Sequence, residues 1–161
     1  MGWHSGQGRG LFHSELGSEF VEAGLSLLGF CALLFLVLDA GWGLFVKVTL
    51  QHAAAEGVRY GVTGRTAPGL GQTASIRTVV QSQAMGLLDS TQAGSIAIRF
   101  YDPVTLAPTA SNAGGNLLEV SIENYQFTPL APLLRSSAPI SITVRASDII
   151  EPSPGGVAPA I

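Results

Sequence analysis

The sequence predicts an α+β protein: a long N-terminal transmembrane helix followed by a small domain of one amphipathic helix on a three-stranded antiparallel sheet. Three observations lead to this fold class. An apolar run without charge occupies residues 23–38, and an alanine-rich stretch follows it. Apolar residues then recur at helical spacing over residues 73–88. Three later segments alternate apolar and polar residues, which is typical of half-buried strands that a helix can cover.

The composition also indicates a membrane protein. Of the 161 residues, 47% are hydrophobic and only 12% are charged, whereas about 25% charged residues is usual in a soluble domain. The formal net charge of -3 predicts no basic face, so we expect no nucleic-acid partner. Cys31 is the only cysteine, which excludes an intramolecular disulfide and a cysteine-based metal site.

The apolar run is long enough to cross a bilayer. It begins at Ala23, is interrupted by Asp39 and continues to Val46, and a membrane-spanning helix needs roughly 20 residues. Trp42 and Phe45 near its far end are suited to the membrane interface. The residues that follow its apolar core make a poor cleavage site for a secretory signal. We therefore expect a retained anchor whose long C-terminal part is exported.

Asp39 has two interpretations. A carboxylate in lipid is costly and usually finds a partner, so Asp39 would line a contact between subunits. Alternatively, it lies near the membrane interface on the exported side, where that cost is small. The second interpretation is favoured because only a few residues separate Asp39 from Lys47.

The helix is expected to continue past the membrane to about residue 60. From Ser18 to Tyr60 it would be roughly 60 Å long at 1.5 Å per residue, a stalk able to lift the domain clear of the bilayer. We expect Gly57, Gly61 and Gly64 to end it progressively.

Three polar side chains on this predicted stalk are candidates for function. Glu56 and Arg59 lie one helical turn apart, which favours a surface ion pair of small energy, with a packing surface shared with the domain as the alternative. His52 has no second ligand nearby in the sequence, so we expect it on the helix surface and predict no metal site.

The remaining elements follow from periodicity. An amphipathic helix is predicted over about Thr73–Leu88. Tyr125 and Phe127 are expected in the core or at its rim. The predicted strands present one apolar face each, formed by Ile96, Ile98 and Phe100, by Leu118, Val120 and Ile122, and by Ile140, Ile142 and Val144. The predicted organisation is a leader at 1–17, a transmembrane and stalk helix at 18–61, an exported α+β domain at 62–150 and a flexible tail at 151–161.

The stretch "GSEFVEAGLS", residues 17–26, joins a polar leader to the apolar run. Gly17 lets the backbone extend into a protease cleft without a side-chain clash. Ser18 and Glu19 suit the first turn of a helix, where hydroxyls and carboxylates satisfy free amides. Glu22 lies one turn further in, where a buried carboxylate needs a partner. The alternative is that both glutamates merely mark the solvated end of a transmembrane helix.

This junction resembles the processing site of type IV prepilins and pseudopilins. The resemblance implies that a prepilin peptidase cuts between Gly17 and Ser18, and that Glu22, the fifth mature residue, pairs with a subunit's new amino terminus. The stretch from Val21 to Gly64 is similar to the TadE/TadG-like proteins of tight-adherence (Flp) pilus systems. Those proteins run from a glutamate through an apolar span with a late acid, here Asp39, to "EGARYA", here "EGVRYG".

Two later segments resemble the same family. They are "LEVSIENYQFTPLAPLL", residues 118–134, and "PISITVRASDIIEP", residues 139–152. The family's leader is commonly rich in arginine, whereas this one has Arg9 alone.

The expected role is structural. We expect a TadE-like minor pilin or pseudopilin in the bacterial cytoplasmic membrane, with its C-terminal domain exported. It would act in assembling a tight-adherence pilus for surface attachment, with the prepilin peptidase, other pilin subunits and the assembly machinery as partners. No nucleophile with a base and an orienting group is apparent, so we predict no enzyme and no cofactor. The alternative is a single-pass envelope protein that tethers a secretion complex or binds a partner without entering a filament.

Overall fold

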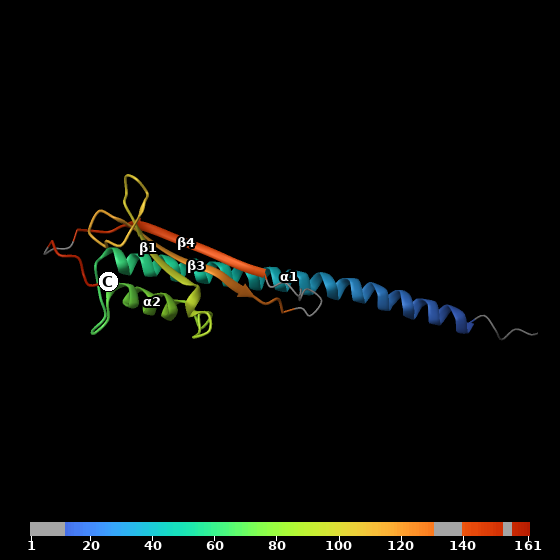
Figure 1. Cartoon of the computed structure of the whole chain (residues 1–161). Coiled ribbons are helices and arrows are strands. Elements are labelled where there is room, and N and C mark those ends of the chain that lie inside the picture. The colour runs from blue at the N-terminus through green and yellow to red at the C-terminus, as the bar shows by residue number, and fades with distance from the viewer. Residues whose placement is uncertain (1–11, 131–139, 153–155) are drawn as a thin grey trace, which may run out of the picture.

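A single long helix carries the whole domain (Figure 1). The computed structural model describes residues 12–130, 140–152 and 156–161. Its elements are, in order, α1 (Phe12–Val62), α2 (Gln72–Gln83), the short 3-10 helix η1 (Ala93–Ser95) and the strands β1 (Ile96–Tyr101), β2 (Pro108–Thr109), β3 (Leu117–Phe127) and β4 (Ile140–Ile149). This order confirms the predicted α+β class, with one long apolar helix ahead of a small domain.

The two halves of α1 lie in different surroundings. From Phe20 to Leu38 nearly every side chain is exposed, whereas Asp39, Val46 and Leu50 are buried. Figure 1 shows the N-terminal half of α1 projecting from the domain and the C-terminal half lying against it. Within the described residues, α1 is the one helix long and apolar enough to cross a membrane, and the most apolar part of its Gly17–Val62 stretch has a mean hydropathy of 2.3.

The C-terminal half of α1 differs from the stalk that we expected. It forms part of the core, where Ala53, Ala54 and Val58 pack with residues of α2 and the sheet. α1 also lies alongside β4, where the Gln51 side chain donates a hydrogen bond of 2.8 Å to the Arg145 carbonyl. The reason is that a three-stranded sheet with one apolar face needs more cover than a helix of 12 residues supplies.

The sheet is antiparallel throughout, in the order β2-β1-β3-β4. The three predicted strands are confirmed, with Ile98 opposite Val120 and Val120 opposite Ala146. The fourth strand, β2, is two residues long and pairs with the end of β1. The sequence does not reveal this strand, because two residues are too few for an alternating pattern and the first is a proline, which has no backbone N–H to donate.

A bulge in β3 keeps its apolar residues on one face. The pairing with β4 shifts between Ile122 and Tyr125, and Asn124 adopts a left-handed conformation with φ of 54°. Because successive strand residues point to opposite faces, the shift returns Tyr125 and Phe127 to the face that holds Ile122. Both are buried, which confirms their predicted place in the core or at its rim.

α2 is shorter than predicted. It ends at Gln83, although Ile76, Val80, Ala84 and Leu88 are all buried as the helical spacing indicated. Met85 and Gly86 have positive φ values of 52° and 82°, so the chain turns there and brings Leu88 to the core from a loop.

Two glycines of α1 are packing positions, which corrects our expectation that they end the helix. A Cβ at Gly57 would collide with the Val80 side chain, and one at Gly61 would collide with the Leu118 side chain. Their spacing, with one glycine a turn above the other, lets α2 and the sheet approach the α1 backbone closely. Gly64, with φ of 65°, lies just past the last residue of α1, so it alone ends the helix as we expected.

Candidate functional site

The Gly17–Ser18 bond lies within a continuous helix. α1 begins at Phe12, ahead of the predicted first residue Ser18, so the bond is one turn or more inside it. A Cβ added at Gly17 would meet nothing within 4 Å. The bond is therefore open to solvent, but a protease that binds extended backbone must first unwind this turn. Glycine in a helix interior costs about 1 kcal/mol relative to alanine, which makes that unwinding easier.

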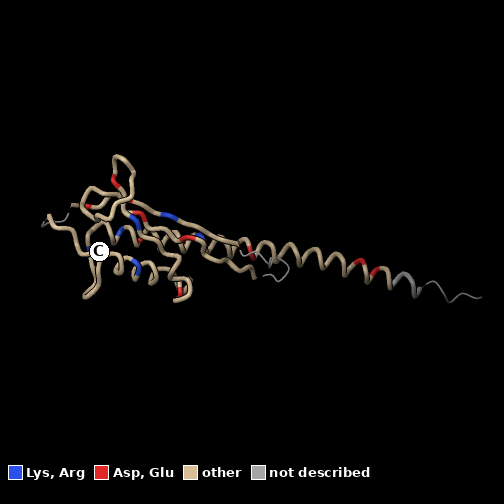
Figure 2. The backbone as a smooth tube through the Cα atoms, in the orientation of Figure 1, with Lys and Arg blue, Asp and Glu red and all other residues tan. Residues whose placement is uncertain are grey.

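Glu19 and Glu22 lie at the solvated start of the apolar run. Both are exposed, and neither has a hydrogen bond or ion pair with another residue that the structure describes. Figure 2 shows acidic residues near the start of the described helix, followed by a stretch without charge that reaches toward the domain. Ser18 and Glu22 are four residues apart and so lie on the same face of α1.

Asp39 lies where the exposed half of α1 meets the domain. It is only 6% exposed, and its Oδ1 accepts a hydrogen bond of 2.6 Å from the Leu130 backbone amide. A cavity of about 430 Å³ adjoins it, lined by side chains that include Leu36, Phe127 and Ile142. The sequence left two interpretations open for Asp39, a contact between subunits or a place near the membrane interface. The structure shows in addition a contact within the chain, with the Leu130 amide.

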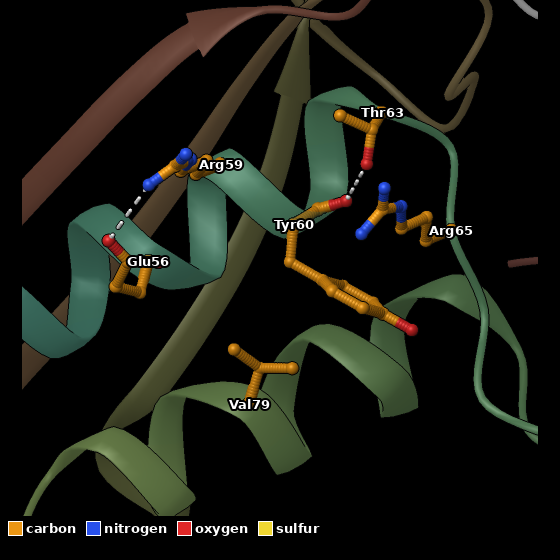
Figure 3. A pocket seen from close by; sticks show the side chains of 6 residues that line it. All are labelled: Glu56, Arg59, Tyr60, Thr63, Arg65 and Val79. Carbon is orange, nitrogen blue, oxygen red and sulfur yellow. Dashed lines mark hydrogen bonds and ion pairs between the residues drawn. The ribbon is translucent and has the colours of Figure 1, made fainter.

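Glu56 and Arg59 form an ion pair of 3.7 Å on the outside of α1. Their side chains are 35% and 81% exposed, which is typical of a surface pair worth at most about 1 kcal/mol. Figure 3 shows the pair on α1 beside Tyr60, whose ring extends toward α2, the helix that carries Val79. An open cavity of about 350 Å³ lies here and is also lined by Thr63 and Arg65.

The N-terminal part of the chain matches a known family. Residues 17–59 match the family model described as TadE-like protein. The matched stretch is similar to that family, and we call it the TadE-like segment. It contains Gly17, Ser18, Glu22, Asp39, Glu56 and Arg59, which are all the site residues named from the sequence. No curated protein and no solved structure matches the chain.

The TadE-like segment ends at Arg59, before α2 and the sheet. Similarity of the later segments at 118–134 and 139–152 to the same family therefore stays a prediction. Residues 1–11 of the predicted leader lie outside the described residues.

Outside the TadE-like segment, a charged cluster lies on the sheet face that α1 and α2 leave uncovered. Arg99 of β1 contacts Glu123 of β3 at 2.6 Å and 3.2 Å through two nitrogens, and it lies 3.5 Å from Glu119. The Ser121 hydroxyl donates to Glu123 at 3.0 Å. The bonds from Arg99 and Ser121 lower the pKa of Glu123 to about 2, and the bond to Glu123 raises the pKa of Arg99.

Periodicity alone does not pair these residues. The strand register, which brings Arg99 opposite Glu119, places them together. The geometry is that of a cross-strand ion pair, which stabilises the sheet.

A second group outside the TadE-like segment joins the end of α1 to the last residues of the chain. The Gln72 side chain is fully buried; it donates to the Gly61 carbonyl at 2.9 Å and accepts from Asn112 at 2.5 Å. The Asn112 side chain also donates to the Pro159 carbonyl at 2.7 Å. The backbone amide of Gln72 donates to the Ala160 carbonyl, also at 2.7 Å. The flexibility predicted for residues 151–161 stays a prediction, although the carbonyls of Pro159 and Ala160 accept hydrogen bonds from Asn112 and Gln72.

Proposed function

We propose that the chain is a TadE-like minor pilin or pseudopilin that acts in assembling a tight-adherence pilus for surface attachment. One observation carries the proposal: the apolar half of the TadE-like segment projects from the domain, and no other residue that the structure describes covers it. A helix exposed in this way requires either lipid or other helices around it, and a membrane-anchored filament subunit uses both in turn.

The first part of the proposal is processing. A prepilin peptidase cuts between Gly17 and Ser18 and removes the leader on the cytoplasmic side. Support comes from the open surroundings of Gly17, from the low helix propensity of glycine, and from the glutamate at the fifth position of the resulting chain.

The second part of the proposal is the pairing of Glu22. A carboxylate at the edge of an apolar bundle is costly unless a positive group satisfies it. The amine of a new Ser18 terminus on a neighbouring subunit supplies that charge and sets the register between helices. Glu22 is exposed and without a partner among the described residues, as a group awaiting a second subunit would be.

The remaining parts concern place and partners. The helix holds the protein in the bacterial cytoplasmic membrane with the domain exported, and other pilin subunits and the assembly machinery bind it there. Its role is packing and not catalysis, and it requires no cofactor. Asp39, Glu56 and Arg59 act in this scheme as helix-packing positions.

The competing proposal is a single-pass envelope protein that tethers a secretion complex without entering a filament. The test is the distribution of the full-length chain between sheared surface filaments and washed membranes. The pilus proposal predicts the processed chain in both fractions, with the filament pool lost when Glu22→Ala replaces the wild type. Finding the wild-type protein only in membranes, while filaments are abundant, would support the tether.

A further inference from the structure

We propose that the membrane-proximal end of the domain rests in the bilayer interface, on the side of the membrane where the domain lies. The contact surface, here called the proximal patch, consists of exposed apolar side chains on α1 and at the near end of the sheet: Leu44, Phe45, Val48, Leu130 and Ile140. The partner is the phospholipid surface itself. This inference rests on α1 crossing a membrane and not on entry into a filament.

The length of the uncharged run is the first argument. About 26 Å of helix separates Glu22 from Asp39 at 1.5 Å per residue. The hydrocarbon core of a bilayer is about 30 Å thick, and helix tilt only shortens the distance spanned. With Glu22 at one boundary of the hydrocarbon, Asp39 has not yet reached the other. The membrane therefore extends beyond Asp39, to the level where the domain begins.

The surroundings of Asp39 are the second argument. A carboxylate at this depth is costly in contact with lipid. Asp39 is 6% exposed, and the Leu130 amide donates to it at 2.6 Å. The domain thus covers this charge from the side, while the Leu130 side chain remains 57% exposed on the outside of the same loop.

The outward face of α1 is the third argument. Past Asp39 it stays apolar through Leu44, Phe45 and Val48, whose side chains are 63%, 44% and 58% exposed. From Glu22 to Val48 the helix is about 39 Å long, close to the 40–45 Å or so of a bilayer with both headgroup layers. Lys47 at this level has a long apolar stem that lets its ammonium reach the headgroups.

The near end of the sheet lies at the same level. A Cβ on Gly43 would be 3.4 Å from the Phe127 ring, and Phe127 is opposite Ile140 in the β3–β4 ladder. Ile140 is 51% exposed there. The stacked rings of Trp42 and Phe45, with centroids 5.5 Å apart, mark the position that aromatic side chains prefer in an interface. Figure 2 shows the charged residues of the domain concentrated toward its other end.

The test uses the full-length chain reconstituted in vesicles of phosphatidylcholine and phosphatidylglycerol. Single cysteines are placed by Leu130→Cys, Ile140→Cys and Val48→Cys in a Cys31→Ala background and labelled with the environment-sensitive dye NBD. Val104→Cys is the matched control, because Val104 is 89% exposed in the β1–β2 loop at the distal end of the domain. Leu33→Cys reports on the span itself, and circular dichroism checks that each variant is folded.

At the three patch positions, we expect aqueous iodide quenching about threefold weaker than at Val104, together with quenching by lipids that carry a shallow spin label. Iodide quenching equal to that at Val104 overturns the proposal. A second copy of the chain, and not lipid, covers the patch if shielding from iodide grows with the protein-to-lipid ratio while the lipid label does not quench. That outcome also overturns the proposal. Failure of a deep lipid label to quench Leu33→Cys would instead refute the membrane span.

Discussion

Glu22 and Asp39 are carboxylates on one helix, and their surroundings differ. Asp39 is buried against the domain and bonded to the Leu130 amide, whereas Glu22 is exposed with no described partner. Removing the Asp39 carboxylate leaves the part-buried Leu130 backbone amide without this acceptor, which costs at most about 3 kcal/mol. Removing the Glu22 carboxylate costs the isolated chain almost nothing. Substitution of Asp39 therefore tests the stability of the subunit, and substitution of Glu22 tests its assembly with other subunits.

Asp39→Ala is expected to lower the thermal midpoint of the purified full-length chain in detergent, whereas Glu22→Ala leaves it unchanged. The reason is the unpaired Leu130 amide in the first variant. Thermal unfolding followed by circular dichroism measures both. Equal midpoints for Asp39→Ala and the wild type would remove the structural role of that hydrogen bond.

The pKa of Glu123 predicts a pH dependence. The folded-state pKa is about 2, below the ordinary value of 4.5, so the carboxylate stabilises the fold above pH 4.5. That stabilisation is lost as the pH falls from 4.5 toward 2. Glu123→Gln should flatten the decline in stability over this range, and Glu151→Gln, at an exposed acid outside the cluster, should not. Unfolding by urea at several pH values distinguishes the two, and identical pH profiles for both variants would contradict this account.

At the scale of elements, α1 combines a free apolar half with a half that forms the domain core. Ala53, Gly57 and Gly61 lie on the face that α2 and β3 approach. Small residues at this spacing make the close crossing possible, since larger ones would force the elements apart. Gly41, nearer the N-terminus, has no such packing role, because a Cβ there would meet nothing within 4 Å.

Gly57→Ala is expected to destabilise the domain by about 1–3 kcal/mol, because the new methyl group collides with Val80. Gly41→Ala is the matched control on the same helix; alanine favours helix there by about 1 kcal/mol and meets no neighbour. Urea unfolding of both variants in detergent measures the difference. If Gly57→Ala is as stable as Gly41→Ala, α1 and α2 do not pack as closely at Gly57 as the structure shows.

Most elements were predictable because their periodicity is strong. The uncharged run, the helical spacing that includes Ile76 and Val80, and the alternation of β1, β3 and β4 each follow from one face buried and one face solvated. The bulge at Asn124 and the pairing of β2 were not predictable, because each depends on the register between distant strands. Nor were the contacts of Arg99 with Glu123 and of Gln72 with Asn112. The turn at Met85 was hidden because the apolar spacing of α2 continues past it to Leu88. The spacing of Gly57 and Gly61 was visible, but it was interpreted as a helix end.

At the scale of the whole molecule, the chain is asymmetric along α1. One end is a bare apolar helix with two acids at its start, and the other is an α+β domain built on the same helix (Figure 1). The described residues of the domain do not cover the apolar half, and we propose that lipid and other pilin helices do. The proximal patch lies between these ends and would fix the depth of the domain against the lipid surface.

The central claim is that this helix is released from a leader at one bond. The most direct measurement is the mass and N-terminal sequence of the protein purified from membranes of cells with an active prepilin peptidase. The account predicts a chain that begins at Ser18, and a Gly17→Ala variant that keeps its leader. A wild-type protein that retains residues 1–17 in those cells would contradict it.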